Sequence, residues 1–233
     1  MSTTIDIIPV DKTDITFGQV IETSERNIND FLNSIGLTQR IKLKVNIHDN
    51  NEKYVNDIRL SDKFEWNDNE YAWFAIDLIA GGTDGYCDKI KDNDIDPENP
   101  WWRLEDMELN NKTVDNIKEK LEKSKSLDRL WSFRRSAGQP GIIALSYGLI
   151  SASVAELTNG ILWSDDGAWD YQRFPAHSKE FLEWYFRPDK AIKDENADWA
   201  KRCIDGIADE LTALNSTLPK AGQTWLQKLF GSK

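Results

Sequence analysis

One long stretch of this chain carries no charge, and it constrains the fold more than any other feature. Residues Ser136–Ala155 contain no Asp, Glu, Lys or Arg, although these four types make up 30% of the sequence. Pro140 suits a helix start and Asn159-Gly160 suits a helix end, so we expect a helix over residues 142–157. Gly, Ser and Pro interrupt the stretch, whereas a membrane span needs about 20 predominantly apolar residues. It therefore predicts a core helix whose small side chains allow close packing on a sheet.

Hydrophobic patterns on both sides of this helix predict an α+β fold. Residues 41–47 alternate apolar and polar side chains, which is typical of a half-buried strand, and residues 71–80 form an apolar run typical of a central strand that contains Asp77. We expect one domain, residues 1–233, with a small mixed or antiparallel sheet covered by helices and a helical C-terminal half. Further short strands are expected at 4–10 and 161–163, and helices at 17–37, 113–133, 175–186, from Trp199 to Leu214 and at 224–230.

One segment carries the whole net charge of −11. Residues 46–110 hold 6 basic and 17 acidic side chains, and the rest of the chain is close to neutral. Within this segment, residues 81–110 lack a periodic pattern, so we expect a long loop there with no more than a short element. The acidity argues against nucleic-acid binding, which depends on Lys and Arg. It favours a surface that attracts a basic protein, although a merely solubilising region has the same composition.

We place the candidate partner-binding residues in the same segment. Its two adjacent Trp residues are typical of binding hot spots, although they could instead fasten the loop to the core. The run Asp92–Asp96 resembles the start of a calcium loop, but Pro97 and Arg103 stand where that loop needs Gly and Glu. We therefore expect no metal and no cofactor. The predicted surface consists of Asp84, Asp88, Asp92, Asp94, Asp96, Glu98, Trp101 and Trp102.

A second acidic group suggests an alternative function. Asp165, Asp166 and Asp170 lie close to Trp163 and Trp169 in the sequence. A pair of carboxyl groups on an aromatic platform is typical of glycosidases, so a hydrolase that uses these aspartates is the alternative hypothesis. The simpler interpretation is a turn in which the aspartates accept backbone N–H groups.

The remaining signals concern location and metal binding. Cys87 and Cys203 lie far apart and form no CxxC motif, so we expect free thiols. The first residues, MSTTIDIIPVDKTD, lack the pattern of a signal peptide, which predicts a cytoplasmic protein. The two histidines, His48 and His177, lack the spacing of a zinc site.

The stretch Leu157–Pro188, LTNGILWSDDGAWDYQRFPAHSKEFLEWYFRP, resembles small bacterial α+β proteins, among them immunity proteins of polymorphic toxin systems. The shared features are a buried helix, a strand led by Gly, a Ser-Asp-Asp-Gly-Ala-Trp turn and an aromatic helix. The resemblance covers 32 of the 233 residues and contains no catalytic signature. It implies a cytoplasmic protein that binds one cognate toxin domain and blocks it. The local acidity suits a basic toxin.

These observations favour a non-enzymatic binding protein with a protein partner, and with neither a nucleic-acid nor a membrane partner. An accessory protein of a bacterial assembly would show the same sequence features. We expect neutralisation of the carboxylates between residues 92 and 98 to weaken partner binding and flatten its salt dependence.

Overall fold

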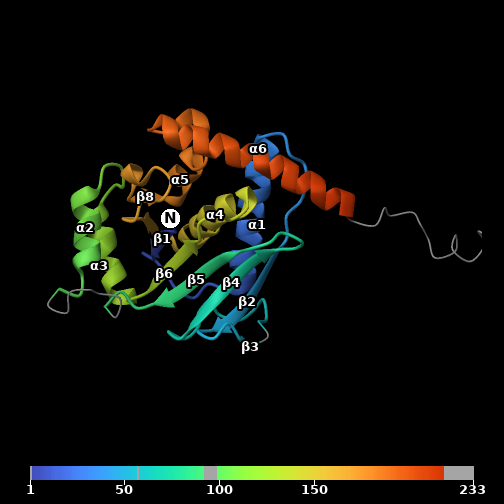
Figure 1. Cartoon of the computed structure of the whole chain (residues 1–233). Helices are drawn as coiled ribbons and strands as arrows, with labels where there is room; N and C mark the ends of the chain where they lie inside the picture. Colours follow the sequence, from blue (N-terminus) through green and yellow to red (C-terminus); the bar gives the residue numbers. More distant parts are fainter. Residues whose placement is uncertain (1, 57, 92–98, 218–233) are drawn as a thin grey trace, which may run out of the picture.

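The computed structural model describes residues 2–56, 58–91 and 99–217 and has an α+β fold with one eight-stranded antiparallel sheet (Figure 1). The strand order is β3-β2-β4-β5-β6-β1-β7-β8. The strands are β1 (Thr3–Ile8), β2 (Leu43–Asp49), β3 (Tyr54–Asn56), β4 (Glu70–Ile76), β5 (Thr83–Asp88), β6 (Leu130–Arg135), β7 (Ile161–Trp163) and β8 (Ala176–His177). The helices are α1 (Phe17–Ser34), α2 (Trp102–Asn110), α3 (Ile117–Leu127), α4 (Gly141–Thr158), α5 (Ser178–Trp184) and α6 (Asp194–Thr217), with short 3-10 turns η2 (Tyr171–Arg173) and η3 (Pro188–Lys190).

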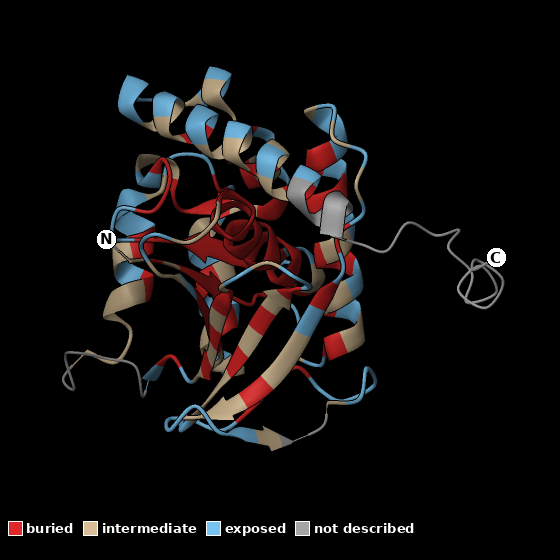
Figure 2. Ribbon diagram, turned by 45° about the vertical axis from the view of Figure 1, so that its right-hand side comes forward, coloured by how far each residue is buried: buried red, intermediate tan, exposed pale blue. Residues whose placement is uncertain are grey.

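Helix α4 is the centre of the core, as the uncharged stretch predicts. All of its residues except Glu156 and Leu157 are buried, and Figure 2 shows it in red at the middle of the molecule. It contacts α1, α5 and α6 and the strands β1, β5, β6 and β7. Among the described residues, α4 is the one helix long and apolar enough to cross a membrane by length and composition. Because it is packed inside the protein, its apolar surface is that of a core helix.

Local capping fixes the two long helices beside the sheet. Helix α1 begins with a capping box: the Thr16 hydroxyl accepts from the Gln19 backbone N–H, and the Gln19 side chain accepts from the Thr16 N–H. Helix α4 ends at Asn159 in the left-handed conformation, and the Gly160 N–H donates to the Ala155 carbonyl at 2.8 Å. Short-range contacts therefore set the start of α1 and the end of α4.

The two faces of the sheet are covered differently. Successive side chains of β1 point to opposite faces. The Thr3 hydroxyl lies 3.1 Å from the Tyr147 hydroxyl of α4, whereas Asp6 on the other face pairs with Arg103 of α2. Helix α4 therefore covers one face and α2 covers the other face at β1 and β6. Figure 1 shows α2 and α3 together at the β6 side of the sheet and α6 running across the top of the view, where it packs against α4.

Three sequence expectations are wrong in detail. Residues 81–110 are not one long loop, because they contain the central strand β5 and the helix α2. The expected helix over 113–133 ends at Leu127, and its remainder forms strand β6. The sheet is therefore larger than expected. Asp77 lies after β4 rather than within it, and its carboxylate pairs with Lys44 Nζ at 2.5 Å.

Candidate functional site

An acidic cleft lies at the end of the sheet where β2 finishes, β4 starts and β5 finishes. It consists of two adjoining pockets of about 510 and 720 Å³ that share Trp66, Asn67, Glu70 and Arg129. Phe17 and the shared Trp66 form an apolar floor, with ring centroids 6.0 Å apart. Six carboxylates line the two pockets. They are Asp49, Asp62, Glu65, Asp68, Glu70 and Asp88.

The loop before β4 forms one wall of the cleft, and backbone hydrogen bonds hold it against the start of α1. The Phe17 N–H donates to the Asp62 carbonyl at 3.1 Å, and the Phe64 N–H donates to the Ile15 carbonyl at 2.8 Å. The Phe64 ring packs edge-on against Trp66, with centroids 5.0 Å apart. These contacts fix the loop, so the wall is part of the folded core rather than a mobile surface.

Three of the carboxylates are oriented by the backbone. Asp49 accepts from the N–H groups of Asn51 and Lys53 at 2.8 and 2.9 Å, and Glu70 accepts from the Asn67 N–H at 3.1 Å. The Lys53 N–H bond is the main cause that holds the pKa of Asp49 below its ordinary 3.8, so Asp49 is ionised at neutral pH. Asp62 likewise accepts from the Arg59 N–H.

The cationic groups of the cleft leave an excess of negative charge. Lys63, Lys89 and Arg129 face the six carboxylates. Arg129 is already engaged, since one guanidinium nitrogen lies 3.7 Å from Glu65 and another donates to Cys87 Sγ at 3.0 Å. Burial raises the pKa of the Cys87 thiol, so Cys87 is a neutral part of the core and not a nucleophile. The cleft therefore attracts positive charge and has no activated nucleophile at this cysteine.

The opposite face of the same strands carries an aromatic cluster. The His48 and Tyr71 rings stack with centroids 5.4 Å apart, and Tyr86 lies 6.4 Å from Tyr71. All three side chains are partly exposed among the residues that the structure describes. Half-exposed aromatic rings beside carboxylates add to the capacity of this sheet end to bind a partner.

The structure distributes the eight predicted partner-binding residues over several places. Asp88 lines the cleft, whereas Asp84 lies partly buried on β5 opposite Arg134 of β6, where burial raises its pKa. Trp101 and Trp102 are partly buried and already face cations of this chain: Lys91 and Lys125 lie 5.2 and 5.8 Å from the Trp101 ring, and Arg103 lies 5.1 Å from the Trp102 ring. The other four lie outside the described residues, namely Asp92, Asp94, Asp96 and Glu98.

The cleft residues other than Asp88 were not singled out in the sequence. They belong to the acidic segment 46–110 or, like Phe17 and Arg129, lie outside it. In the sequence, the carboxylates among them are marked only by their charge, and Phe17 and Trp66 are not marked by charge at all. Nothing in a linear sequence brings residues 49, 68 and 88 together, because the sheet register does so.

The aspartates of the hydrolase alternative do not share one site. Asp170 is fully buried, and its carboxylate accepts from the Ile192 N–H, the Asn196 amide and Arg173. Asp166 accepts from the Thr4 N–H at 2.7 Å. Asp165 lines a pocket of about 270 Å³.

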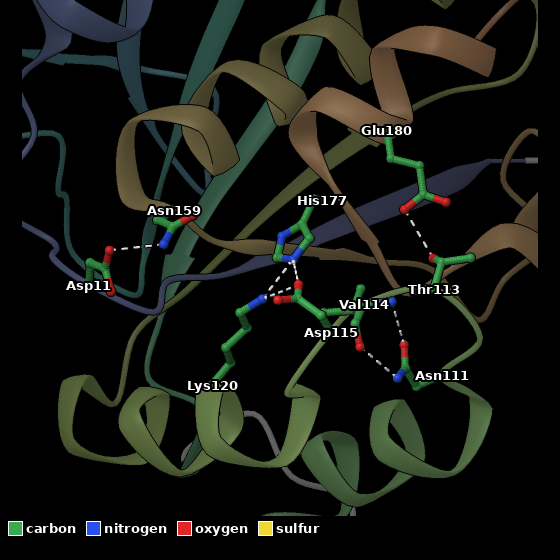
Figure 3. A network of polar contacts seen from close by, with 9 residues as sticks. All are labelled: Asp11, Asn111, Thr113, Val114, Asp115, Lys120, Asn159, His177 and Glu180. Carbon is green, nitrogen blue, oxygen red and sulfur yellow. Dashed lines mark hydrogen bonds and ion pairs between the residues drawn. The ribbon is translucent and has the colours of Figure 1, made fainter.

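The two histidines have separate surroundings. His177 Nε2 lies 2.9 Å from Lys120 Nζ and 3.3 Å from Asp115 Oδ1, and Lys120 lies 2.7 Å from the same oxygen (Figure 3). Lys120 is the main cause that holds the pKa of Asp115 below 3.8. This network connects the α2–α3 region to the start of α5. His48 lies on β2 and belongs to the aromatic cluster with Tyr71 of β4.

No cluster of three or more His, Cys, Asp or Glu side chains within the described ranges is arranged to hold a metal ion. Comparison of the chain with protein-family models, with curated proteins and with solved structures finds no match. The geometry and charge of the cleft are therefore the features that point to a function.

Proposed function

We propose that this chain is a non-enzymatic binding protein that captures a basic protein partner in the acidic cleft. The observation that carries the proposal is the set of six carboxylates that line the two adjoining pockets, together with the aromatic side chains of Trp66 and Phe17. Lys and Arg side chains combine an aliphatic stem with a charged end, so they suit such a cleft. Concentrated negative charge also accelerates encounter with a positive surface.

Within this class we propose a bacterial immunity protein that acts in the cytoplasm by blocking a cognate toxin domain. The resemblance of residues 157–188 supports the proposal, and the acidity suits a toxin that is itself basic. Blocking requires only a tight complex, so the chain needs no catalytic group of its own. The rigid wall of the cleft favours a tight complex, because a preformed surface loses less conformational entropy on binding.

The first test is capture of the partner by wild-type and variant chains from the native host at low and moderate salt. Glu65 and Asp68 are exposed and can be reversed as Glu65→Lys and Asp68→Lys without loss of a described backbone hydrogen bond. Two exposed aspartates of α6 give a control with the same change of net charge, Asp198→Lys and Asp205→Lys. We expect the cleft variant to bind a basic partner at least about ten-fold more weakly than the control, since apposed like charges are strongly unfavourable.

The results separate the two levels of the proposal. Equal capture by the cleft variant and the control would exclude the cleft as the binding surface. A basic partner that does not stop bacterial growth when expressed alone, or whose toxicity is not relieved by this chain, would exclude the immunity function. Neutralisation of the carboxylates between 92 and 98 tests the contribution of the adjoining acidic stretch in the same assay.

A further inference from the structure

Polar contacts help to hold helix α3 and the connection before it against the segment formed by β8 and α5. The helix buries two of its own side chains, Leu121 and Ser124. Before it, the Thr113 hydroxyl donates to the Glu180 carboxylate of α5 at 3.0 Å (Figure 3). An element with few buried side chains opens at a low cost in free energy, so the attachment of α3 is sensitive to single polar contacts.

His177, directly before α5, makes a second contact with α3. Its Nε2 atom lies 2.9 Å from Lys120 Nζ, and Lys120 also donates to Asp115 Oδ1 at 2.7 Å (Figure 3). An ammonium group has three donors and no acceptor, so at this distance Nε2 accepts and the ring is neutral. The structure therefore shows the triad of His177, Lys120 and Asp115 in the state in which His177 carries no charge.

A proton on Nε2 changes this contact from attractive to repulsive. Nε2 then becomes a donor that faces another donor, and both groups carry positive charge. The side chains of His177 and Lys120 are 27% and 16% exposed, whereas that of Asp115 is 75% exposed. Because water screens the more exposed charge more strongly, the attraction from Asp115 at 3.3 Å is weaker than the repulsion from Lys120 at 2.9 Å.

The other carboxylates drawn in Figure 3 are engaged away from the histidine ring. Glu180 of α5 accepts from the threonine hydroxyl described above, and Asp11, which follows β1, accepts from the Asn159 amide at 2.9 Å. On the neighbouring strand β7, the residue opposite His177 is Ile161, which carries no charge. The balance of charge at the ring is therefore set by the triad itself.

Within the triad, His177 is the member that changes charge in mildly acidic solution. Histidine side chains ordinarily gain a proton between about pH 8 and pH 5. Asp115 stays ionised over that range, because Lys120 first and His177 second hold the pKa of its carboxyl below 3.8.

We propose that the triad is a pH-sensitive contact, in which the proton that His177 gains in mildly acidic solution displaces Lys120 and loosens α3 from α5. The hydrogen bond that breaks is the one from the Lys120 ammonium group to Nε2, and the proton that replaces it comes from the solvent. The Thr113 contact remains, so α3 opens more often but stays attached. The triad is separate from the acidic cleft, and this inference does not rest on the proposed partner.

The test is backbone amide hydrogen exchange of the ¹⁵N-labelled full chain at about pH 7.5 and about pH 5.5, expressed as protection factors that remove the intrinsic effect of pH on exchange. We expect the protection factors of α3 to fall about two- to five-fold at the lower pH in the wild type, which is the size of one partly exposed polar contact. Those of α1, which carries no residue of the triad, should stay constant and provide the internal reference.

Two pairs of variants assign the effect to the triad. His177→Gln keeps an acceptor for Lys120 but cannot gain a proton, so the fall should disappear, whereas His48→Gln, at the second of the chain's 2 histidines, should keep it. Lys120→Met leaves a protonated His177 facing Asp115 without the competing cation, so the protection of α3 should rise at the lower pH. Lys118→Met, at an exposed lysine of the same helix, should keep the wild-type fall.

The outcomes decide the proposal in either direction. An equal fall in His177→Gln and the wild type, or no fall in the wild type, would overturn it. A fall in Lys120→Met as large as that in Lys118→Met would also overturn it. If His177→Gln does not fold, the two lysine variants still test the sign of the effect.

Discussion

The two halves of the sheet bury their charges very differently. In the half formed by β6, β1, β7 and β8, the ion pair of Asp6 and Arg103 has side chains that are 7% and 14% exposed. In the half formed by β3, β2, β4 and β5, the ion pair of Lys44 and Asp77 has side chains that are 62% and 60% exposed. Within the described residues, α4 and α2 cover the two faces of the first half at β1 and β6, whereas one face of the second half has partly exposed side chains at His48, Tyr71 and Tyr86.

This difference assigns separate roles to the halves. A buried pair is costly to break, because the remaining charge stays in a medium of low polarity, whereas an exposed pair exchanges its partner for water. The covered half, formed by β6, β1, β7 and β8, therefore supports the fold. The open half, formed by β3, β2, β4 and β5, can carry many carboxylates at little cost to the fold, which leaves its charge free for a partner.

The largest expected effect is at the buried pair. Arg103→Met should destabilise the fold by about 3–5 kcal/mol at neutral pH, because Asp6 stays buried without its cation. The measurement is urea unfolding followed by tryptophan fluorescence. The double variant with Asp6→Asn should recover much of the loss, since no buried charge remains. A loss below about 0.5 kcal/mol in Arg103→Met would show that this half tolerates charge as the open half does.

The pH dependence sharpens this prediction. Burial raises the pKa of the Asp6 carboxyl above 3.8, although Arg103 and the Ser132 hydroxyl act in the opposite direction. The folded chain then binds this proton more tightly than the unfolded chain, so the contribution of Asp6 to stability falls as pH rises from 3.8 through the raised pKa. Removal of Arg103 raises that pKa further. The difference in the free energy of unfolding between wild type and Arg103→Met should therefore shrink as pH falls toward about 4. A difference that stays constant with pH would contradict this prediction.

A smaller effect is expected from packing at α4. A Cβ atom at Gly148 would lie 2.2 Å from the buried Tyr185 ring, whose hydroxyl donates to the Ala144 carbonyl at 3.0 Å. Gly148→Ala should cost about 1–3 kcal/mol, because the ring must move. Gly206→Ala on α6 is the matched control: its new Cβ would meet nothing closer than 3.9 Å, so it should stabilise the helix by about 0.5–1 kcal/mol. Thermal unfolding should give a lower Tm for Gly148→Ala and a higher Tm for Gly206→Ala. Equal shifts in Tm would contradict the close packing at Gly148.

The smallest effect is expected at the exposed pair of the open half. Asp77→Asn should change the free energy of unfolding by about 0.5 kcal/mol or less, because the pair with Lys44 is mostly solvated. Urea unfolding at low and high salt provides the measurement. A loss of several kcal/mol that persists at high salt would mean that the open half depends on its charges for folding.

The helices expected at 17–37, 142–157, 175–186 and from Trp199 to Leu214 correspond to α1, α4, α5 and α6, whereas the patterns do not predict α2 or the strands β5 and β6. The helix expected at 224–230 lies outside the described residues. The helical spacing of Leu127, Leu130 and Trp131 predicts a helix where β6 lies, and residues 130–133, all buried, show no alternation. Strand β5, TDGYCD, has few apolar side chains, and its place depends on pairing with β4 and β6. Its buried positions are Thr83, Gly85 and Cys87, and of these Thr83 alone has a marked strand preference.

The sequence by itself indicated that the helix expected from residue 142 lies in the core, as residues 142–155 do, and that the net charge belongs to residues 46–110. Both follow from composition, since a long apolar helix is buried and an excess of carboxylates must meet water or a partner. Only the tertiary structure decided which carboxylates converge. Asp49, Asp68 and Asp88 meet because antiparallel pairing brings the end of β2, the start of β4 and the end of β5 to one edge of the sheet. That register depends on contacts between distant residues, which no local pattern records.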